Sequence, residues 1–331
     1  MLRKVTAAAA ALLVSTSLAA AAEISPAVVF DMGGKFDKSF NEGVYNGVEQ
    51  FKKETGIEYR EFEVTNETQR EQALRRMAQR GADPVIGVGF AQAPAMEKIA
   101  TEFPNTRFAI IDAVVDLPNV RSIVFKEHEG SFLVGMIAAM KSGTGKVGFV
   151  GGMDIPLIRK FACGYEQGAK HVSGDTEVVQ NMTGTTPAAW NDPTRGSELA
   201  KSQFDRGVDV IYAAAGGTGV GVYQTADDSG KLAIGVDSNQ NYLHPGTMLT
   251  SMLKRVDVAA YKAFKDAADD NWTSGIQVLG LAEDGVGWAL DEYNSDLVTE
   301  EMKAKVEQAA ADIVAGKLQV HDYTADNSCT Y

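Results

Sequence analysis

The sequence has little positive charge and few of the residues that catalytic and metal sites need. Its 331 residues include 31 Lys and Arg against 44 Asp and Glu, which gives a net charge of −13. We therefore expect neither nucleic acid nor an anionic lipid surface as a partner. The four histidines show no metal-ligand spacing, and no Gly-x-Ser-x-Gly nucleophile motif occurs. We predict a protein that is not an enzyme and that uses neither a metal nor a cofactor.

Long apolar runs are missing beyond the first residues. Residues 1–22 begin with Arg3 and Lys4, continue as an alanine-rich apolar stretch and end in small residues, which is typical of a secretory signal peptide. No later stretch is apolar enough to span a membrane. Because no cysteine lies near residue 22, we expect an exported protein that is free in a periplasm and has no lipid anchor.

Cysteine is scarce, with Cys163 and Cys329 as the two present. An exported protein meets an oxidising compartment, in which disulfides form and persist. We favour a disulfide that ties the C-terminal tail to a helix of the second half. Two separate thiols are the alternative, because sequence spacing does not test the geometry of the bond.

Nucleotide phosphate loops are missing too, although two glycine-rich segments resemble them. Residues 216–221 lack the two-residue gap between the second and third glycines of the dinucleotide fingerprint. Residues 143–146 lack the earlier glycine of a P-loop and precede a predicted strand instead of a helix. We interpret both segments as places where a ligand can approach the backbone closely.

The most informative feature that is present is an internal repeat. The spacing Phe-x-x-Gly-x-x-x-Gly starts at Phe40 and again at Phe161, each time after a short apolar run and a glycine pair. An Arg-Gly-x-Asp segment follows at Arg80 and at Arg206, and an apolar run that ends in Asp comes next in each half. The three elements recur in the same order at offsets of 121, 126 and 125 residues, which indicates a duplicated architecture. Glycines four residues apart share one helix face, and we expect them to let a helix pack closely against a sheet.

Each half alternates short apolar runs with stretches of helical periodicity. This alternation is typical of a parallel sheet with helices on both faces. We therefore predict an α/β protein with two doubly wound lobes that are joined by crossover segments. The N-terminal lobe is expected to comprise 23–124 and about 250–275, and the C-terminal lobe 125–249 and about 276–331.

Two aspartates are candidates for a ligand site. Ligands of such sheets bind beyond the carboxyl ends of the strands. Asp112 and Asp237 each follow an apolar run at equivalent places in the two halves. Their carboxylates would accept hydrogen bonds from a polar ligand, and capping of the next helix is the alternative role.

Two aromatic residues in polar loops, Phe36 and Trp190, are further candidates. They could stack on a planar ring from two sides, and packing on the protein surface is the alternative. Phe40 and Phe161, which occupy matching positions in the two helices of the repeat, are expected in the core instead.

Three segments, in this order, resemble motifs of the basic membrane protein family. They are Asp31 to Gly43 (DMGGKFDKSFNEG), Gly235 to Gln240 (GVDSNQ) and Thr250 to Asp257 (TSMLKRVD). Members of this family are substrate-binding proteins of ABC importers, with purine-nucleoside receptors as the best-known members. The resemblance implies a type I periplasmic-binding-protein fold that closes on a ligand between its lobes.

The resemblance also implies which residues hold the ligand. Phe36 and Trp190 would stack on a base, Asn41 and Asp112 would hydrogen-bond to it, Asp237 and Lys254 would hold the ribose hydroxyls, Gly217 would let the sugar approach the backbone, and Asp37 would belong to the same wall. Many family members are lipoproteins, and the lack of a lipid-bearing cysteine is a departure of this sequence from the family.

From these features we expect a monomeric, non-catalytic protein that binds a purine nucleoside and passes it to the permease of an ABC transporter. Two Asp and one aligned Lys would repel the phosphate of a nucleotide. A sugar or a signal molecule is the alternative ligand, and a periplasmic nucleosidase is the alternative function.

Overall fold

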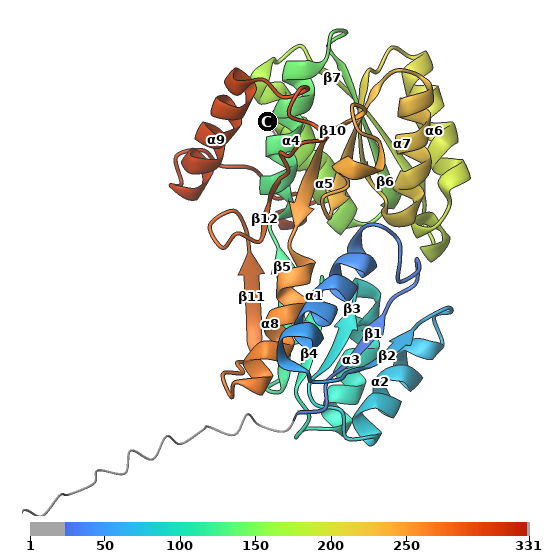
Figure 1. Cartoon of the computed structure of the whole chain (residues 1–331), viewed down its shortest axis with the longest axis vertical. Coiled ribbons are helices and arrows are strands. Elements are labelled where there is room, and N and C mark those ends of the chain that lie inside the picture. Colours follow the sequence, from blue (N-terminus) through green and yellow to red (C-terminus); the bar gives the residue numbers. More distant parts are fainter. Residues whose placement is uncertain (1–23, 330–331) are drawn as a thin grey trace, which may run out of the picture.

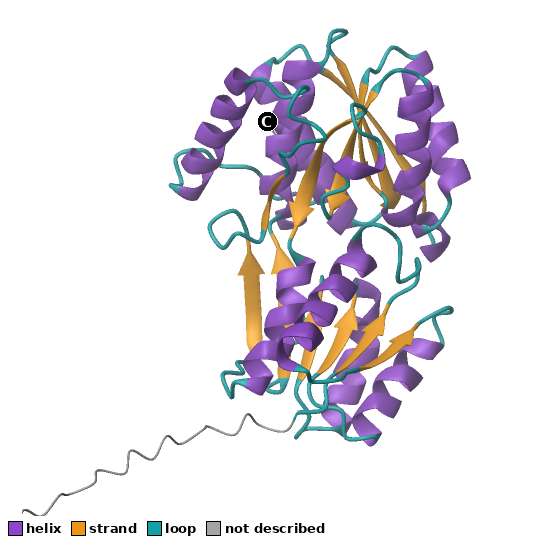
Figure 2. Ribbon diagram, in the orientation of Figure 1, coloured by secondary structure: helices purple, strands orange, loops and turns teal. Residues whose placement is uncertain are grey.

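The computed structural model describes residues 24–329, which form two lobes of the same architecture (Figure 1). In this part of the chain each lobe contains a six-stranded sheet between layers of helices (Figure 2). In spatial order, the strands of the N-terminal sheet are β11 (Gly275–Leu279), β5 (Val120–Phe125), β4 (Phe108–Ile111), β3 (Val85–Val88), β1 (Ala27–Phe30) and β2 (Arg60–Glu63). Those of the C-terminal sheet are β12 (Val286–Trp288), β10 (Met248–Lys254), β9 (Leu232–Asp237), β8 (Val210–Ala214), β6 (Lys146–Met153) and β7 (Glu177–Gly184).

The two sheets share one strand order, in which the first strand lies between the second and the third. β1 pairs with β2 and β3, and β6 pairs with β7 and β8, all in parallel. Among the pairs described, the antiparallel one is the edge pair of β10 and β12. Strands such as β1 (AVVF) and β8 (VIYAA) are fully buried, because helices cover both faces of a parallel sheet. The prediction of two doubly wound lobes is confirmed.

Helices cover both faces of each sheet. Those of the N-terminal lobe are α1 (Phe40–Thr55), α2 (Gln69–Gln79), α3 (Ala93–Glu102) and α8 (Val256–Ala268). Those of the C-terminal lobe are α4 (Glu127–Lys141), α5 (Pro156–Val172), α6 (Pro193–Asp205), α7 (Gly219–Asp228) and α9 (Glu300–Val314). Short 3-10 helices are η1 (Phe90–Gln92), η2 (Pro187–Trp190), η3 (Gly216–Thr218), η4 (Asn241–Leu243) and η5 (Tyr323–Ala325). One hydrophobic core continues through both lobes under α1, α8, α4 and α5, and two smaller cores lie under α2 and α3 and under α6 and α7.

The chain crosses between the lobes from β5 to α4, from β10 to α8, and from β11 to β12. Strand pairing places two segments differently from the prediction. Residues 250–254, expected in the N-terminal lobe, belong to β10, which pairs with β9 of the C-terminal sheet. Residues 276–279, expected in the C-terminal lobe, belong to β11, which pairs with β5 of the N-terminal sheet. Local sequence does not reveal which sheet such a strand joins, because that is decided by its pairing partner.

The repeated glycines bring two helices together, and not a helix and a sheet as expected. A Cβ on Gly47 of α1 would lie 2.0 Å from the carbonyl oxygen of Asp257 in α8. A Cβ on Gly168 of α5 would lie 1.9 Å from the carbonyl oxygen of Phe132 in α4. In each lobe, glycine therefore lets two helix backbones touch on the same face of the sheet.

The C-terminal tail after α9 returns to α5. Cys163 of α5 and Cys329 of the tail form a disulfide, with their Cα atoms 5.5 Å apart. Gly316, just after α9, has a φ of 71° and ends the helix in the left-handed conformation that glycine adopts easily. Within residues 24–329, none of the helices combines the length and the apolar character needed to cross a bilayer.

Candidate functional site

A cavity lies between the lobes, at the carboxyl ends of the strands of both sheets. Counting the open solvent at its mouth, it holds about 630 Å³ of space that protein atoms do not fill. Its walls come from both lobes, so a ligand in it would contact both. The residues that line it are Asp31, Met32, Asp37, Phe40, Asn41, Gly89, Phe90, Asp112, Leu157, Ile158, Phe161, Trp190, Ala214, Gly216, Val236, Asp237 and Lys254.

Four aromatic side chains line this cavity: Phe40 and Phe90 from the N-terminal lobe, and Phe161 and Trp190 from the C-terminal lobe. Of these, the sequence analysis proposed Trp190 alone as a ligand-binding residue. Phe40 and Phe161 were assigned to the core. Phe40 begins α1 and Phe161 lies in the second turn of α5, and both rings pack on the core and also line the cavity. Phe90 was missed, although it comes two residues after the end of β3 and the rule that ligands bind after strands would have found it.

Phe36 lies outside the cavity, which corrects the expectation that it stacks on a base. Its side chain is 59% exposed. The ring packs edge-on against Tyr45 of α1, with 5.2 Å between centroids, and the Lys35 ammonium lies 4.9 Å from its centroid. The Phe36 ring therefore packs against Tyr45 and Lys35 on the outer surface of the lobe.

Lys254, the last residue of β10, is buried at the junction of the lobes. Its ammonium lies 2.7 Å from Oδ2 of Asp112 and 3.0 Å from Oε1 of Glu127. The ring centroids of Phe40, Phe125 and Phe161 lie 5.1–5.4 Å from the same nitrogen. Burial alone would lower the pKa of Lys254, but the surrounding carboxylates hold it above its ordinary value. The lysine therefore remains a cation at the wall of the cavity.

Asp112 is the carboxylate that Lys254 approaches most closely. Its side chain is 6% exposed, and no described group donates a hydrogen bond to its Oδ1 atom. Burial raises the pKa of Asp112 to about 6, and Lys254 opposes this shift. A buried acceptor without a donor is costly, so this oxygen is a place where a ligand can supply one.

Asp237 lies in the corresponding position of the C-terminal lobe. It accepts a hydrogen bond on Oδ2 from the Ser39 hydroxyl of the N-terminal lobe. Burial raises its pKa to about 6, against the effects of Lys254 and Ser39. Asp112 and Asp237 both have left-handed backbone conformations, with φ of 72° and 64°. Such conformations in residues other than glycine cluster at functional sites.

Asp37 and Asn41 occupy the start of α1. The Asp37 carboxylate accepts hydrogen bonds from the backbone N–H groups of Ser39, Asn41 and Glu42 and from the Asn41 amide, so it caps the helix. The other amide atom of Asn41, Oδ1, is buried without a described hydrogen-bond partner. Asn41 thus offers a second free acceptor in the cavity, whereas both oxygens of Asp37 already accept hydrogen bonds from the start of the helix.

Gly217 is not among the lining residues, and its neighbour Gly216 is. A Cβ on Gly217 would lie 3.3 Å from the carbonyl oxygen of Trp190, so this glycine packs beneath the Trp190 backbone. Six of the eight residues expected to bind ligand line the cavity: Asp37, Asn41, Asp112, Trp190, Asp237 and Lys254. Within residues 24–329, no group of three or more His, Cys, Asp or Glu side chains has an arrangement that could hold a metal ion.

The lobes touch each other directly beside the cavity. Ser39 and Asp237 form one contact, the Ser238 hydroxyl donates to the Ser39 carbonyl at 3.2 Å, and the Gln240 amide donates to the Lys38 carbonyl at 2.8 Å. These bonds join the start of α1 to the loop after β9. The structure therefore represents a closed arrangement of the two lobes.

Three similar proteins bear on the location of the protein. An uncharacterised lipoprotein of Pyrococcus abyssi is 36% identical over 284 residues, which cover 82% of this chain and 70% of the relative, and similar proteins of P. furiosus and P. horikoshii are also named lipoproteins. This finding contradicts the prediction of a free periplasmic protein without a lipid anchor. The apolar start of the chain is common to secreted proteins and lipoproteins, and the prediction of a free protein rested on the lack of a cysteine near residue 22. Residues 1–22, on which the signal-peptide prediction rests, lie outside the described residues.

Sequence and structure comparisons agree on the family. The model of a family described as ABC transporter substrate-binding protein PnrA-like matches residues 24–323. The ABC transporter nucleoside-binding protein BmpA of Lactococcus lactis subsp. cremoris is 30% identical over 321 residues, which cover 90% of this chain and 89% of that protein. The crystal structure of an ABC transporter solute-binding protein from Aeropyrum pernix K1 is 30% identical, has a TM-score of 0.83 and covers 89% of this chain and 92% of that one. The chain therefore belongs to the family of PnrA-like, or basic membrane protein, substrate-binding proteins of ABC transporters.

Proposed function

We propose that this substrate-binding protein holds a purine nucleoside in the cavity between its lobes, as a monomer and without chemical turnover, and delivers it to the permease of an ABC transporter. Both walls of the cavity come from one chain, so a single copy contains the whole site. The proposal extends the family assignment to a ligand, for which the name of the Lactococcus relative provides a precedent.

The observation that carries the proposal is the pair of unpartnered acceptors in the cavity. Oδ1 of Asp112 and Oδ1 of Asn41 are both buried, and neither has a described donor. Burying such atoms without a hydrogen bond costs about 1–3 kcal/mol each, and a ligand with N–H or O–H groups would recover this. The ring N–H and amino groups of a purine and the hydroxyls of its ribose are donors of this kind.

The aromatic lining favours a ligand with a flat face. Phe40, Phe90, Phe161 and Trp190 come from opposite lobes and meet at the same cavity. A nucleobase can stack on aromatic rings with its whole flat face, whereas a free sugar has no planar ring and contacts such rings through its C–H groups. The aromatic surface, together with the resemblance of the motifs to nucleoside receptors, supports a purine nucleoside over a sugar.

The charges of the cavity favour a nucleoside over a nucleotide. Of the described residues that line it, four are carboxylates and one is a cation: Asp31, Asp37, Asp112, Asp237 and Lys254. The Lys254 ammonium is already shared by Asp112 and Glu127. A phosphate group in this cavity would meet net negative charge and lose its water, so its binding would be unfavourable.

Binding without turnover fits the same arrangement. The described lining contains neither His nor Cys, and its one lysine is held as a cation by two carboxylates. A lysine in that state is not a base or a nucleophile. The polar groups are thus arranged to hold a ligand.

The test is isothermal titration of refolded, ligand-stripped protein with adenosine, guanosine, inosine, uridine and ribose. We expect binding of the purine nucleosides and weaker binding of uridine and ribose. Asp112→Asn should weaken the binding of the preferred nucleoside, because a hydrogen bond to a charged group contributes about 1.5–3 kcal/mol. This corresponds to a dissociation constant about 10- to 150-fold higher.

The matched control is Asp116→Asn, since Asp116 lies on the same loop and is exposed. It should bind like the wild type. Binding of ribose with no response to any nucleoside would reject the proposed ligand and leave the family assignment unchanged. Release of free base from a bound nucleoside would reject binding without turnover.

A further inference from the structure

A series of buried charged side chains extends from Lys254 at the cavity into the junction between the lobes. Glu127, the first residue of α4, is 1% exposed and lies where the chain first crosses from one lobe to the other. Its Oε1 atom faces the Lys254 ammonium at 3.0 Å. Lys254 itself precedes the second crossing. The pair therefore connects two of the three segments that join the lobes.

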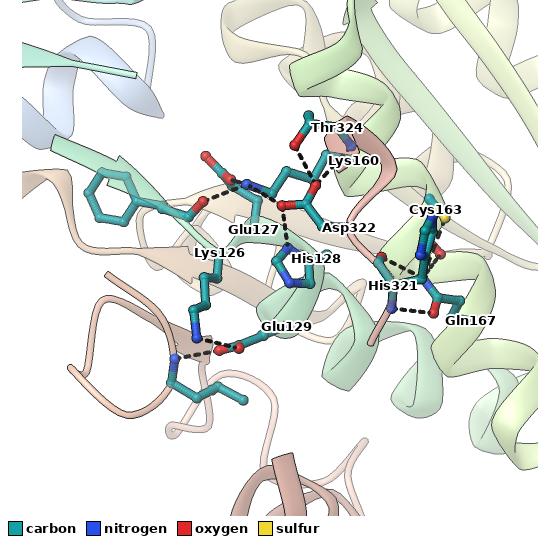
Figure 3. A network of polar contacts seen from close by, with 12 residues as sticks. Lys126, Glu127, His128, Glu129, Lys160, Cys163, Gln167, His321, Asp322 and Thr324 are labelled. Atoms are coloured by element: carbon teal, nitrogen blue, oxygen red, sulfur yellow. Dashed lines mark hydrogen bonds and ion pairs between the residues drawn. The ribbon is translucent and has the colours of Figure 1, made fainter. Parts of the chain in front are cut away.

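The other oxygen of Glu127 faces a second buried lysine. Oε2 lies 3.0 Å from the ammonium of Lys160 in α5, which also donates to the Phe125 carbonyl at 2.7 Å (Figure 3). Burial alone would raise the pKa of Glu127, but Lys254 and Lys160 hold it below its ordinary value. Glu127 is thus an anion between two cations.

The C-terminal tail supplies the next charge. Oδ2 of Asp322 lies 3.4 Å from the Lys160 ammonium, and the ring of His128 lies 3.8 Å from the same carboxylate (Figure 3). Asp322 also accepts hydrogen bonds from Thr324 on its other oxygen, which orients its carboxylate. Charges of alternating sign therefore run from the tail, through the junction, to Asp112 in the cavity.

The tail is attached to α5 on both sides of Asp322. Before it, the backbone of His321 exchanges two hydrogen bonds with the Gln167 amide, at 2.8 and 3.0 Å (Figure 3). After it, Cys329 is bonded to Cys163, which lies on α5 three residues from Lys160. The disulfide and these hydrogen bonds thus hold the tail against α5 on both sides of Asp322, whose carboxylate lies beside Lys160.

We propose that Glu127 is a positioning residue for ligand binding, which holds the Lys254 ammonium at the cavity wall, and that the disulfide-held tail supports it through Asp322 and Lys160. Ligand affinity then depends on a tail that does not itself line the cavity. The choice of ligand rests on the function proposed above, but the positioning role does not.

The physical reason is the high cost of buried charge. Lys254 is 2% exposed, so it needs two anions and aromatic faces to stay charged at that place. Removing Glu127 would leave it with Asp112 alone and would let the ammonium move toward that carboxylate. The Asp112 carboxylate would then be neutralised more fully by Lys254 and would be a weaker hydrogen-bond acceptor for a ligand. The junction between the lobes would also lose the Glu127–Lys254 ion pair, which links two crossings.

A buried ion network could also stabilise the fold without affecting the ligand, and ligand titrations over a range of pH distinguish the two roles. The charged groups that face Asp112 are Lys254, Glu127 and Asp237. Burial raises the pKa of Asp112, and the negative charge of Glu127 adds to that shift. Neutralising Glu127 should therefore lower the pKa of Asp112 and move the acid limb of binding to lower pH. The affinity at neutral pH, where Asp112 is charged in both proteins, tests the positioning role itself, because a purely structural role would leave that affinity unchanged.

The experiment compares wild type with Glu127→Gln and Asp322→Asn. Titration with inosine, guanosine and adenosine between pH 5 and 8 gives the affinity and its pH midpoint. Carbon-13 NMR of the Asp carboxyls in ligand-free protein gives the pKa of Asp112 without any ligand. We expect Glu127→Gln to weaken binding by about fivefold or more, within the usual range for coupled sites. The pKa of Asp112 should fall below its wild-type value in the same variant.

Asp322→Asn keeps the hydrogen bonds to Thr324 and removes the charge that Lys160 faces. We expect it to weaken binding in the same direction as Glu127→Gln, and reduction of the wild-type disulfide should do likewise. Because the substitution and the reduction both act through the contact of Asp322 with Lys160, reduction of the disulfide should change the ligand affinity of the Asp322→Asn variant little further. The control is Asp154→Asn, which breaks an exposed ion pair with Arg159 on the same helix as Lys160 and should leave binding unchanged.

Unchanged affinity in both Glu127→Gln and Asp322→Asn, with an unchanged Asp112 pKa, would overturn the positioning role. If Glu127→Gln does not fold, Asp322→Asn and the reduced wild type decide the matter alone. If wild type binds none of the three nucleosides, the function proposed above fails, while the NMR titration of Asp112 still tests the effect of Glu127.

Discussion

The indole ring of Trp190 lies against Gly152, in space that any side chain at that position would need. A Cβ on Gly152 would be 2.1 Å from Cζ3 of the ring. On the other side, a Cβ on Gly33 of the N-terminal lobe would be 3.4 Å from the Cβ of Trp190. Both glycines belong to the glycine pairs of the repeat. Gly152 thus makes room for the indole ring at the cavity between the lobes, whereas a Cβ on Gly33 would make an ordinary van der Waals contact with Trp190.

Gly152→Ala should therefore displace Trp190 and weaken nucleoside binding. Loss of one aromatic contact is worth about 0.5–1.5 kcal/mol, so we expect the dissociation constant to rise roughly 2- to 10-fold. Isothermal titration measures the affinity. Gly184→Ala is the control, because its Cβ would make an ordinary 3.7 Å contact with Ala189. Equal affinity in both variants would show that the ring does not depend on Gly152.

Substitution of two phenylalanines, one in the cavity and one on the outer surface, should affect ligand affinity differently. Phe161 lines the cavity and Phe36 does not. We expect Phe161→Leu to weaken the binding of purine nucleosides, whereas Phe36→Leu should bind like the wild type because its ring packs on Tyr45 outside the cavity. Titration of both variants with the same nucleoside is the measurement. A loss of affinity in Phe36→Leu alone would show that the bound form differs from the closed arrangement described above.

Binding should weaken in acid because of Asp112 and Asp237. Burial raises the pKa of each to about 6, from an ordinary value of 3.8. As the pH falls through 6, each carboxylate takes up a proton and becomes a poorer acceptor for the ligand. Titrations from pH 7.5 to 5 should show this decline, and Asp237→Asn should show a shallower one. A flat wild-type profile would contradict the raised pKa values.

Acidification should weaken ligand binding through Asp112 and Asp237 but should relieve the destabilising effect of the same two groups on the fold. The folded protein binds their protons more tightly than the unfolded chain, so their destabilising effect is complete above pH 6 and is relieved as the pH falls toward 4. Denaturant unfolding of wild type and Asp237→Asn between pH 7 and 4 isolates this contribution. The difference in unfolding free energy should favour the variant at pH 7 and shrink on acidification. A difference that grows in acid would mean that Asp237 is stabilised as an anion.

Gly168→Ala should destabilise the C-terminal lobe. The new Cβ would lie 1.9 Å from the backbone of α4, so α4 and α5 would have to separate. Overpacking of this kind typically costs about 1–3 kcal/mol. Urea unfolding measures it, with Gly174→Ala as the control because no atom lies within 4 Å of its Cβ. Equal stability of the two variants would show that the helices can move apart freely.

The sequence predicted the elements of the site better than their geometry. Asp112 and Asp237 were found because each ends an apolar run, and the structure places both at the cavity. Phe36 was misplaced and Phe90 missed, because the direction of a loop side chain depends on neighbours that are distant in the sequence. Glu127 gave no local signal at all, since its importance comes from two lysines, Lys160 and Lys254, that lie elsewhere in the chain.

What the sequence by itself determined is the duplicated alternation of strands and helices, because apolar periodicity and glycine spacing act over a few residues and repeat in both halves. What only the tertiary structure decided is where β10 and β11 pair, which aromatic rings face the cavity, and which charges meet at Lys254. The strand that pairs with β11 and the carboxylates that meet Lys254 lie more than a hundred residues away in the chain. The partner of β10, β9, is nearer in the sequence, but the local pattern does not specify the pairing. Burial then decides their energetics, because a charge or an acceptor withdrawn from water requires a partner that only the folded chain brings near.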